Sequence, residues 1–301
     1  YYSPYKNPKL SDGPEGEYLT DRLTDESIEF IEKRDVSKPF AVFLSFYNVH
    51  TPIQANLKHI DYYENKLKKY SDTDIQTTNE GKAISVLNQR NTRYASMVHS
   101  TDENIGRLIS FLKEKNLYNN TLIIFTSDNG GLSTQAKLAP TSTKPLRAGK
   151  GWLYEGGIRI PQLIKFVNQK NQHLNDNPVV SYDLFATVVN HLKLNHNLDE
   201  KDGIDLSFSN KKIKREYILW HFPHYHGSLW KPGSAIRNGD WKLLKFYEEN
   251  KLELYNLKKD LGEETELSGK YPLIVKKLSN KMDEMLIEMN GKLPTINQNL
   301  N

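Results

Sequence analysis

Two short apolar runs limit the possible fold of this chain most. Each run is preceded by a segment with helical spacing and followed by polar residues. Pro39–Phe46 is almost continuously apolar, and Asn119–Thr126 is rich in β-branched residues. Apolar residues recur at helical spacing from near Thr20 or Thr24 to Lys33, and again over Tyr94–Lys115. Short apolar runs between helices are typical of buried strands in a parallel sheet. This order predicts an α/β domain with right-handed crossovers.

The pattern changes after about Asp202, where short segments of strand-forming residues are separated by turn signals such as Asn238-Gly239. These segments predict an antiparallel meander, and Tyr271–Met289 predicts a closing helix. The expected strands are Glu216–Phe222, Ser234–Arg237, Trp241–Tyr247 and Leu252–Tyr255. We therefore expect two units, an α/β domain over 1–205 and a smaller subdomain over 206–301.

Composition excludes several classes of function. The 41 basic and 37 acidic residues are mixed along the chain and give a net charge of only +4, so a nucleic-acid partner is not expected. The absence of cysteine excludes disulfides, thiolate metal sites and cysteine nucleophiles. No apolar run reaches the roughly 18–20 residues that a membrane span needs, so no span is expected.

Polar side chains follow both apolar runs. Asp128 and Asn129 follow the second run, and His50 follows the first. In α/β sheets, ligands gather beyond the carboxyl ends of strands. The oxygens of Asp128 and Asn129 are hard donors that suit calcium, although Asp-Asn-Gly taken alone is equally an ordinary turn. His50 is placed to bind an anion or to protonate a leaving oxygen.

A third polar segment surrounds Lys150. The flanking residues Gly149 and Gly151 let the backbone bring the ammonium close to a ligand. A lysine is a compact charge that can neutralise a sulfate or phosphate oxygen. We expect Glu155 to hold this loop through hydrogen bonds to backbone amides. A flexible surface loop is the alternative.

The three segments, in this order, resemble motifs of the formylglycine-dependent sulfatases of the alkaline-phosphatase-like superfamily. The resemblance is carried by Thr126-Ser-Asp-Asn-Gly-Gly131, by His50-Thr-Pro52, and by Gly149-Lys-Gly151 with Gly156-Gly-Ile-Arg-Ile-Pro161. Four further segments resemble motifs of the family, although in the first of them the family usually has Pro where Ala186 stands. These are Ser181–Thr187, Asp202–Leu206, Ser234–Leu243 and Leu252–Leu257.

The resemblance implies an alkaline-phosphatase-like, mostly parallel sheet flanked by helices, with a small C-terminal α+β subdomain built on an antiparallel sheet. It implies that Asp128 and Asn129 are calcium ligands. His50 and Lys150 would be the catalytic residues, both holding the sulfate, with His50 as the general acid. Calcium would polarise the sulfate oxygens and position the nucleophile.

The resemblance also implies a missing part. Family members carry, upstream, a paired-aspartate calcium site and a Cys- or Ser-x-Pro-x-Arg motif whose first residue is oxidised to the formylglycine nucleophile. This chain contains no cysteine and no Ser-x-Pro-x-Arg. We therefore expect the N-terminal part of the same protein to be its partner, and the 301 residues alone to be inactive and poorly soluble. By resemblance the protein is periplasmic or secreted.

The segment Trp220–Gly227 is dense in aromatic residues and histidines. His221, His224 and His226 are predicted to line a pocket that reads a sugar, with a zinc site as the less favoured alternative. Arg237 is a second candidate for binding carboxylates or sulfates through two hydrogen bonds.

The favoured function is a sulfuric ester hydrolase acting on a sulfated carbohydrate or polysaccharide. One alternative is a phosphodiesterase or phosphonate hydrolase of the same superfamily, which shares the fold and part of the metal site. Another is a non-catalytic protein that binds sulfated glycans. The identity of the nucleophile in the upstream segment would distinguish a sulfatase from these alternatives.

Overall fold

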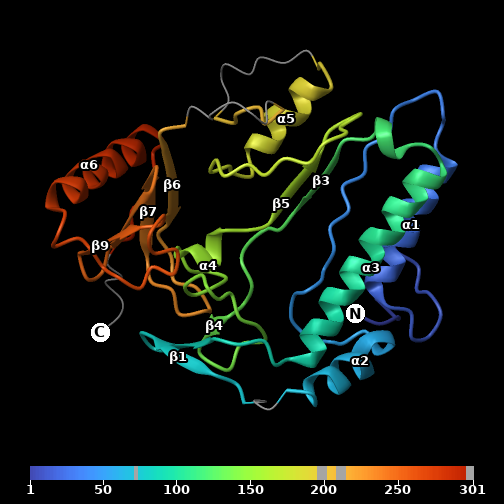
Figure 1. Ribbon diagram of the computed structural model, residues 1–301, viewed down its shortest axis with the longest axis horizontal. Coiled ribbons are helices and arrows are strands. Elements are labelled where there is room, and N and C mark those ends of the chain that lie inside the picture. Colours follow the sequence, from blue (N-terminus) through green and yellow to red (C-terminus); the bar gives the residue numbers. More distant parts are fainter. Residues whose placement is uncertain (71–73, 195–201, 208–214, 296–301) are drawn as a thin grey trace.

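The computed structural model describes residues 1–70, 74–194, 202–207 and 215–295. Three helices lie together in the N-terminal half, where α3 (Thr92–Glu114) packs against both α1 (Leu19–Lys33) and α2 (Leu57–Leu67) (Figure 1). The two predicted helices, one from near Thr20 or Thr24 to Lys33 and one over Tyr94–Lys115, are confirmed as α1 and α3. The side chain of Asn91 caps α3 by accepting a hydrogen bond from the Tyr94 amide at 3.0 Å.

The strands of this half are short. β3 (Ile123–Thr126) pairs with β5 (Gln162–Lys165), and β2 (Ala83–Val86) lies between β1 (Thr77–Glu80) and β4 (Thr134–Gln135). Three short helices complete the region: the 3₁₀ turn Tyr118–Asn120, α4 (Glu155–Ile158) and α5 (Asp183–His191). The second predicted strand is confirmed for Ile123–Thr126 as β3, but Asn119 and Asn120 lie in the 3₁₀ turn, and β3 is half-buried to exposed where a buried strand was predicted.

The first predicted strand is wrong in the described structure. Residues 39–46 are extended but form no strand, and Figure 1 draws them as a blue trace between β3 and the helices α1 and α3. Phe40 packs on a cluster with Ile31 and Phe111, but the side chain of Phe43 is 97% exposed. No described strand supplies a hydrogen-bonding ladder for this run, and no described element covers Phe43.

The predicted parallel sheet is also not confirmed. β3 and β5 run antiparallel, with Ile124 opposite Ile164, and every other strand pair in the described residues is antiparallel as well. The described fold is therefore mixed α/β with antiparallel sheets.

The C-terminal sheet follows the prediction. β6 (Tyr217–Phe222), β7 (Gly233–Asn238), β8 (Trp241–Phe246) and β9 (Lys251–Asn256) form a four-stranded meander, and α6 (Pro272–Glu288) closes the chain. Gly239 has a φ of +58° in the turn between β7 and β8, which confirms the expected Asn-Gly hairpin.

Both faces of this sheet are buried, because successive residues of a strand point to opposite faces. Leu243 and its neighbours on one face pack against Leu278 and Met282 of α6. On the other face Leu244 and Tyr255 pack against Trp152 and other aromatic residues of the loop around Lys150. That loop therefore shares a hydrophobic core with the C-terminal sheet, and the boundary at 205/206 stays a prediction.

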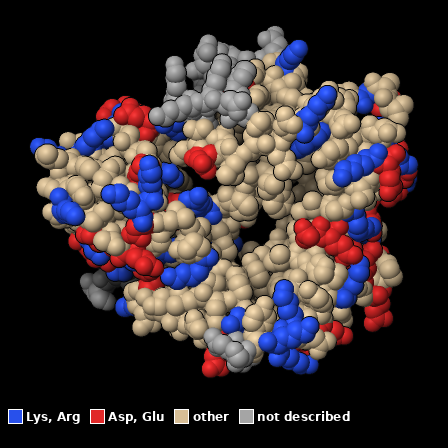
Figure 2. Space-filling model, in the orientation of Figure 1, with Lys and Arg blue, Asp and Glu red and all other residues tan. Residues whose placement is uncertain are grey.

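Figure 2 shows basic and acidic side chains intermixed over the visible face, which is hollowed near its centre. Within the described ranges, no helix combines the length and the apolar character that crossing a membrane requires.

Candidate active site

The segment after β3 turns sharply and meets the loop around Lys150. The Gly130 amide donates a hydrogen bond to the Gly157 carbonyl at 2.9 Å. A Cβ atom on Gly130 would lie 1.8 Å from the Gly156 carbonyl oxygen, so only glycine allows this approach. The exposed Asp128 accepts a hydrogen bond at Oδ1 from the Asn129 amide, at 2.9 Å.

A second backbone hydrogen bond joins the two segments. The Lys150 amide donates to the Gly131 carbonyl at 2.9 Å. The structure thus brings together the backbones that carry Asp128, Asn129 and Lys150. Two side chains with oxygen donors and one lysine therefore lie on neighbouring loops, and these residue types suit a divalent cation beside an anionic group.

Buried charges support the base of the Lys150 loop. The ammonium of Lys242 on β8 is fully buried and lies 3.0 Å from Glu155 Oε1 and 2.8 Å from Glu263 Oε1. Glu263 Oε2 accepts a hydrogen bond from the Glu155 amide at 2.6 Å. Burial raises the pKa of Glu263, against the opposing effect of the Lys242 charge.

These contacts correct the expectation for Glu155 and identify two further residues that support the Lys150 loop. Glu155 was expected to bond backbone amides, but its carboxylate pairs with Lys242, and Glu263 accepts the amide instead. The sequence analysis missed Lys242 and Glu263. The only local signal was that apolar Leu243 and Leu244 follow Lys242, which indicates a strand with both faces buried.

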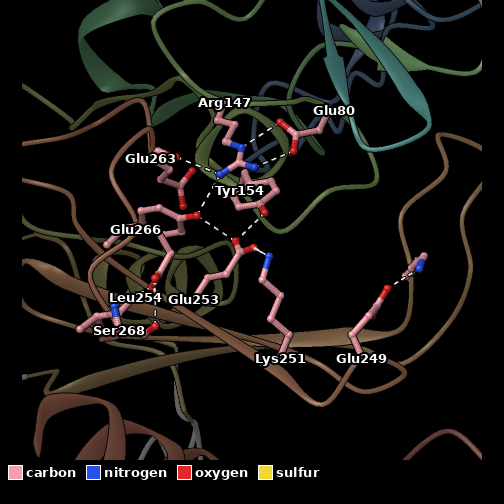
Figure 3. Close-up of polar contacts among 12 residues, drawn as sticks. Glu80, Arg147, Tyr154, Glu249, Lys251, Glu253, Leu254, Glu263, Glu266 and Ser268 are labelled. Atoms are coloured by element: carbon pink, nitrogen blue, oxygen red, sulfur yellow. Dashed lines mark hydrogen bonds and ion pairs between the residues drawn. The ribbon is translucent and has the colours of Figure 1, made fainter. Parts of the chain in front are cut away.

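Arg147 links the same loop to two sheets (Figure 3). Its Nε and Nη2 atoms donate to the two carboxylate oxygens of Glu80 on β1, at 2.8 and 2.6 Å. Nη1 donates at 2.9 Å to the hydroxyl of Tyr255 on β9. The guanidinium also lies 3.9 Å from the centre of the Tyr154 ring. Arg147 therefore fixes the Lys150 loop against β1 and β9.

His226 reaches this loop from the C-terminal subdomain. A Cβ atom on Gly151 would lie 2.1 Å from His226 Nδ1. The Ser228 amide donates to Nδ1 at 3.1 Å, so Nδ1 is an acceptor and the ring proton sits on Nε2. Burial, helped by the positive charge of Lys150, lowers the pKa of His226. His226 therefore presents the N–H of Nε2 as a donor beside the Lys150 loop.

The other predicted sugar-binding residues differ in their surroundings. Both ring nitrogens of His221 are engaged, Nδ1 with Ser234 Oγ at 2.6 Å and Nε2 with the Lys292 carbonyl at 2.9 Å. This geometry favours a structural role for His221. The His224 ring is exposed and meets the edge of Phe222. The His226 ring also meets Phe222, with ring centroids 6.1 Å apart, and over the described ranges no three His, Asp or Glu residues are grouped to hold a metal.

Arg237 lies on the face of β7 that turns toward the Lys150 loop. It stands opposite Lys242 in the β7–β8 register, so the two side chains share one face. Its Nε donates to the Gly239 carbonyl at 2.9 Å, and burial lowers its pKa. Arg237 is thus near the charges of Lys242 and Glu155, and its contact with substrate stays a prediction.

His50 lies in an exposed turn packed near α3, not at the end of a strand. Its Nδ1 is 2.8 Å from the Thr51 carbonyl oxygen, which assigns the proton to Nδ1 and leaves Nε2 outward. The hydroxyl of Tyr1 donates to the His50 carbonyl at 2.6 Å. Among the described residues, no side-chain contact joins His50 to Asp128 or Lys150. Its catalytic role therefore stays a prediction.

The calcium prediction can be tested against the donor atoms present. Asp128 Oδ2 and Asn129 Oδ1 accept no hydrogen bond from the part of the chain that the structure describes, and both are hard oxygen donors. Calcium takes about six to eight oxygen ligands. Asp128 and Asn129 fit calcium chemically, but they supply only part of a coordination shell.

Comparison with known proteins shows the family of the chain. The family model described as Sulfatase matches residues 1–194, and the model described as N-sulphoglucosamine sulphohydrolase, C-terminal, matches residues 148–291. A sulfatase of Formosa agariphila is 30% identical, over 95% of this chain and 53% of the relative. Arylsulfatase J of Mus musculus is 27% identical, over 94% and 51%. The chain spans about half the length of these curated relatives.

Solved structures share the fold of this chain. The crystal structure of Ps i-CgsB in complex with k-i-k-neocarrahexaose matches with a TM-score of 0.71 at 27% identity, covering 92% of this chain and 56% of that one. A structure in complex with its substrate D-glucosamine-2-N,6-O-disulfate matches with a TM-score of 0.72 at 20% identity, covering 89% and 69%, and shows the fold alone. Since the family model matches more than half of the residues, this chain belongs to the sulfatase family.

Proposed function

We propose that this chain supplies part of the active site of a sulfuric ester hydrolase that acts on a sulfated carbohydrate. The observation that carries the proposal is the pair of backbone hydrogen bonds, from Lys150 to Gly131 and from Gly130 to Gly157, in a chain of the sulfatase family. They hold the backbone of Lys150 close to the segment that carries Asp128 and Asn129, and a sulfate ester on a divalent cation requires such a cationic side chain near oxygen donors.

Each residue has a separate role in this proposal. Lys150 neutralises charge on the sulfate oxygens as the ester bond breaks. His50, in its imidazolium form with a proton on Nε2 as well as on Nδ1, donates the Nε2 proton to the leaving alcohol. Asp128 and Asn129 contribute two oxygens to a calcium ion. When bound, calcium polarises the sulfate and orients the nucleophile. The nucleophile itself, a formylglycine hydrate, comes from another part of the same protein.

The carbohydrate side of the proposal rests on two observations. A relative at 27% identity was solved in complex with k-i-k-neocarrahexaose. In this chain, His226 carries an N–H donor next to Lys150, and such donors recognise hydroxyl or sulfate oxygens. We propose that His226, with His224 and Arg237 further along the subdomain, contacts the sugar. A periplasmic or secreted location is part of the same proposal.

The partner of this chain is proposed to be another part of the same protein, which would cover residues 41–45. The exposed Phe43 and an open cavity of about 430 Å³ between these residues and α1 support this proposal. The 301 residues alone are then expected to aggregate and to release no sulfate. A monomeric, cooperatively unfolding chain of 301 residues would contradict this part of the proposal.

The whole protein provides the test of activity. Purified protein should release sulfate from sulfated oligosaccharides, measured by ion chromatography, and should leave phosphodiesters and phosphonates intact. Lys150→Ala should lower kcat by about 10²–10³-fold, as removal of a charge-stabilising group does. The matched control is Lys137→Ala, at an exposed lysine of the same region. Preferential hydrolysis of phosphodiesters, or glycan binding without any hydrolysis, would replace this proposal with one of the two alternatives.

A further inference from the structure

The turn that carries His50 is held by the side chain of a tyrosine that has none of the roles above. In this His50 turn, residues 47–50, the His50 amide donates a hydrogen bond to the Tyr47 carbonyl at 2.9 Å. The hydroxyl of Tyr1 lies 2.8 Å from the same carbonyl oxygen and 2.6 Å from the carbonyl oxygen of His50. One hydroxyl group therefore bridges the two ends of the His50 turn.

Tyr1 is itself fixed against the beginning of α1. Its carbonyl accepts a hydrogen bond at 2.8 Å from the amide of Leu19, the first residue of α1. Its half-buried ring stacks on the buried ring of Tyr18, with the ring centroids 5.7 Å apart. The hydroxyl is thus presented to the His50 turn from a regular element, and such elements place functional groups more accurately than loops do.

The Tyr1 hydroxyl remains a hydrogen-bond donor over the whole working range of pH. Burial, followed by the nearby Tyr47, raises the pKa of Tyr1 to about 12, although the hydrogen bond to the His50 backbone opposes the shift. Carbonyl oxygens accept hydrogen bonds and cannot donate them, so the protonated hydroxyl is the form that both contacts need.

The backbone of the His50 turn determines where the imidazole lies. Nδ1 of His50 is 2.8 Å from the Thr51 carbonyl oxygen. The imidazole meets the Tyr47 ring edge-on, with the centroids 6.4 Å apart and the planes at 78°. The two residues whose carbonyls Tyr1 holds are therefore the two whose rings face each other. A rotation of this backbone would move Nε2 of His50.

We infer that Tyr1 is a positioning residue for His50 in the cleavage of the sulfate ester. The inference rests on the proposed function, in which the Nε2 proton of the His50 imidazolium moves to the alcohol oxygen as the sulfur–oxygen bond breaks. Proton transfer from a well-placed acid contributes about 10²–10⁴-fold to a rate, and a small displacement of the acid reduces this contribution. Because Tyr1 contacts the backbone of His50, its effect should grow with the need of the leaving group for a proton.

Two substrates with different leaving groups test the inference in the whole protein. A sugar alcohol is a poor leaving group that needs the proton, whereas 4-nitrophenolate leaves as a stable anion. Tyr1→Phe removes the hydroxyl and keeps the ring. We expect kcat for a sulfated oligosaccharide to fall about tenfold at an unchanged KM, and kcat for 4-nitrophenyl sulfate to fall by less than about twofold.

Tyr2→Phe is the matched control. The Tyr2 hydroxyl donates to the Ala55 carbonyl at 2.8 Å and accepts from the Leu57 amide at 2.9 Å, so it holds the chain beyond the His50 turn. Any loss in this variant should be the same on both substrates, because a protein that is only destabilised loses both activities together. His50→Ala provides the reference and should lose at least as much on the oligosaccharide as Tyr1→Phe does.

An equal loss on both substrates in Tyr1→Phe, or no loss on the oligosaccharide, would overturn the inference. If the wild-type protein releases no sulfate, or if His50→Ala loses both activities equally, the proposed function or the proposed role of His50 fails instead. Amide hydrogen exchange separates these failures, because it needs no turnover. Residues 47–51 should exchange faster in Tyr1→Phe than in Tyr2→Phe, and equal exchange would show that Tyr1 does not hold the His50 turn.

Discussion

The imidazole of His226 lies against the backbone of Gly151, so closely that a Cβ atom at position 151 would be 2.1 Å from Nδ1. Gly151 also has a φ of +85°, a backbone conformation that disfavours any side chain. The Gly-Lys-Gly sequence therefore has a second purpose besides flexibility. It lets a ring from the C-terminal subdomain sit directly beside Lys150.

Gly151→Ala should therefore destabilise the protein for two reasons, the strained φ and the collision with His226. Gly16→Ala isolates the first reason, because Gly16 has a φ of +83° and open space around its Cβ position. We expect the control to cost about 1–2 kcal/mol and Gly151→Ala to cost clearly more, in urea unfolding of the whole protein. Combining His226→Ala with Gly151→Ala should recover part of the extra loss of stability. Equal losses for Gly151→Ala and Gly16→Ala would refute the contact between Gly151 and His226.

Lys242→Met should be strongly destabilising. The substitution leaves the buried carboxylates of Glu155 and Glu263 without their cation, a loss that costs about 3–5 kcal/mol in buried ion pairs. Lys245→Met, on the same strand but in a partly exposed pair with Asp283, should cost no more than about 1 kcal/mol. Chemical unfolding of both variants checks this, and similar midpoints would show that Lys242 does not hold the loop.

Arg147→Lys tests the link between the Lys150 loop and β1. A lysine keeps the charge but cannot bind both oxygens of Glu80 and the Tyr255 hydroxyl at once. We expect a loss of about 1.5–3 kcal/mol and a lower kcat. The control is Arg107→Lys, in an exposed pair with Asp25, which should change neither quantity measurably. Wild-type stability in Arg147→Lys would contradict the proposed link.

A pair of stacked histidines makes stability depend on pH. The rings of His59 on α2 and His99 on α3 lie 3.9 Å apart, and His59 Nε2 is 2.9 Å from Glu103. Burial, followed by the charge of His99, lowers the pKa of His59, while Glu103 opposes the shift and Lys58 adds to it. Tyr62 and Tyr63 meet His99 edge-on.

Because the folded pKa lies below the unfolded value of about 6.5, the unfolded state binds more protons in the window between them. Stability is then full above about pH 6.5 and falls as the pH drops through the lowered folded pKa. Urea midpoints at pH 7.5, 6.5 and 5.5 should show this fall, and His59→Phe should make it smaller. His173→Phe, at an exposed histidine, should leave it unchanged. A fall of the same size in His59→Phe would exclude His59 as its source.

Removal of calcium should abolish activity of the whole protein if Asp128 and Asn129 are ligands. Chelation should lower sulfate release, and added calcium should restore it. Asp128→Ala should raise the calcium concentration needed for half-maximal rate and for half-maximal thermal stabilisation, because calcium binds only the folded protein. Asp176→Ala, at an exposed aspartate elsewhere, serves as the control. Unchanged calcium dependence in Asp128→Ala would remove Asp128 from the ligand set.

The sequence alone was enough to place the C-terminal meander, the long helices and β3. Each of these has a local pattern of apolar spacing, and the turn at Asn238-Gly239 has its own local chemistry. It also pointed to the segments of Asp128 and Lys150, because short motifs with glycine are read within a few residues. The prediction was wrong for residues 39–46. An apolar run indicates an extended segment, but it specifies neither the element that packs over that segment nor a neighbouring strand and its direction.

Tertiary structure alone decided which polar residues are buried and which are exposed. The sequence indicates a surface lysine at Lys242, and its burial is tolerated because Glu155, 87 residues earlier in the chain, and Glu263 meet its ammonium. His221 and His226 stand in one short segment, yet one has both ring nitrogens bonded and the other lies beside Lys150. The physical reason is the same in each case. The energy of a buried polar group depends on partners that are distant in sequence, and no local pattern encodes them.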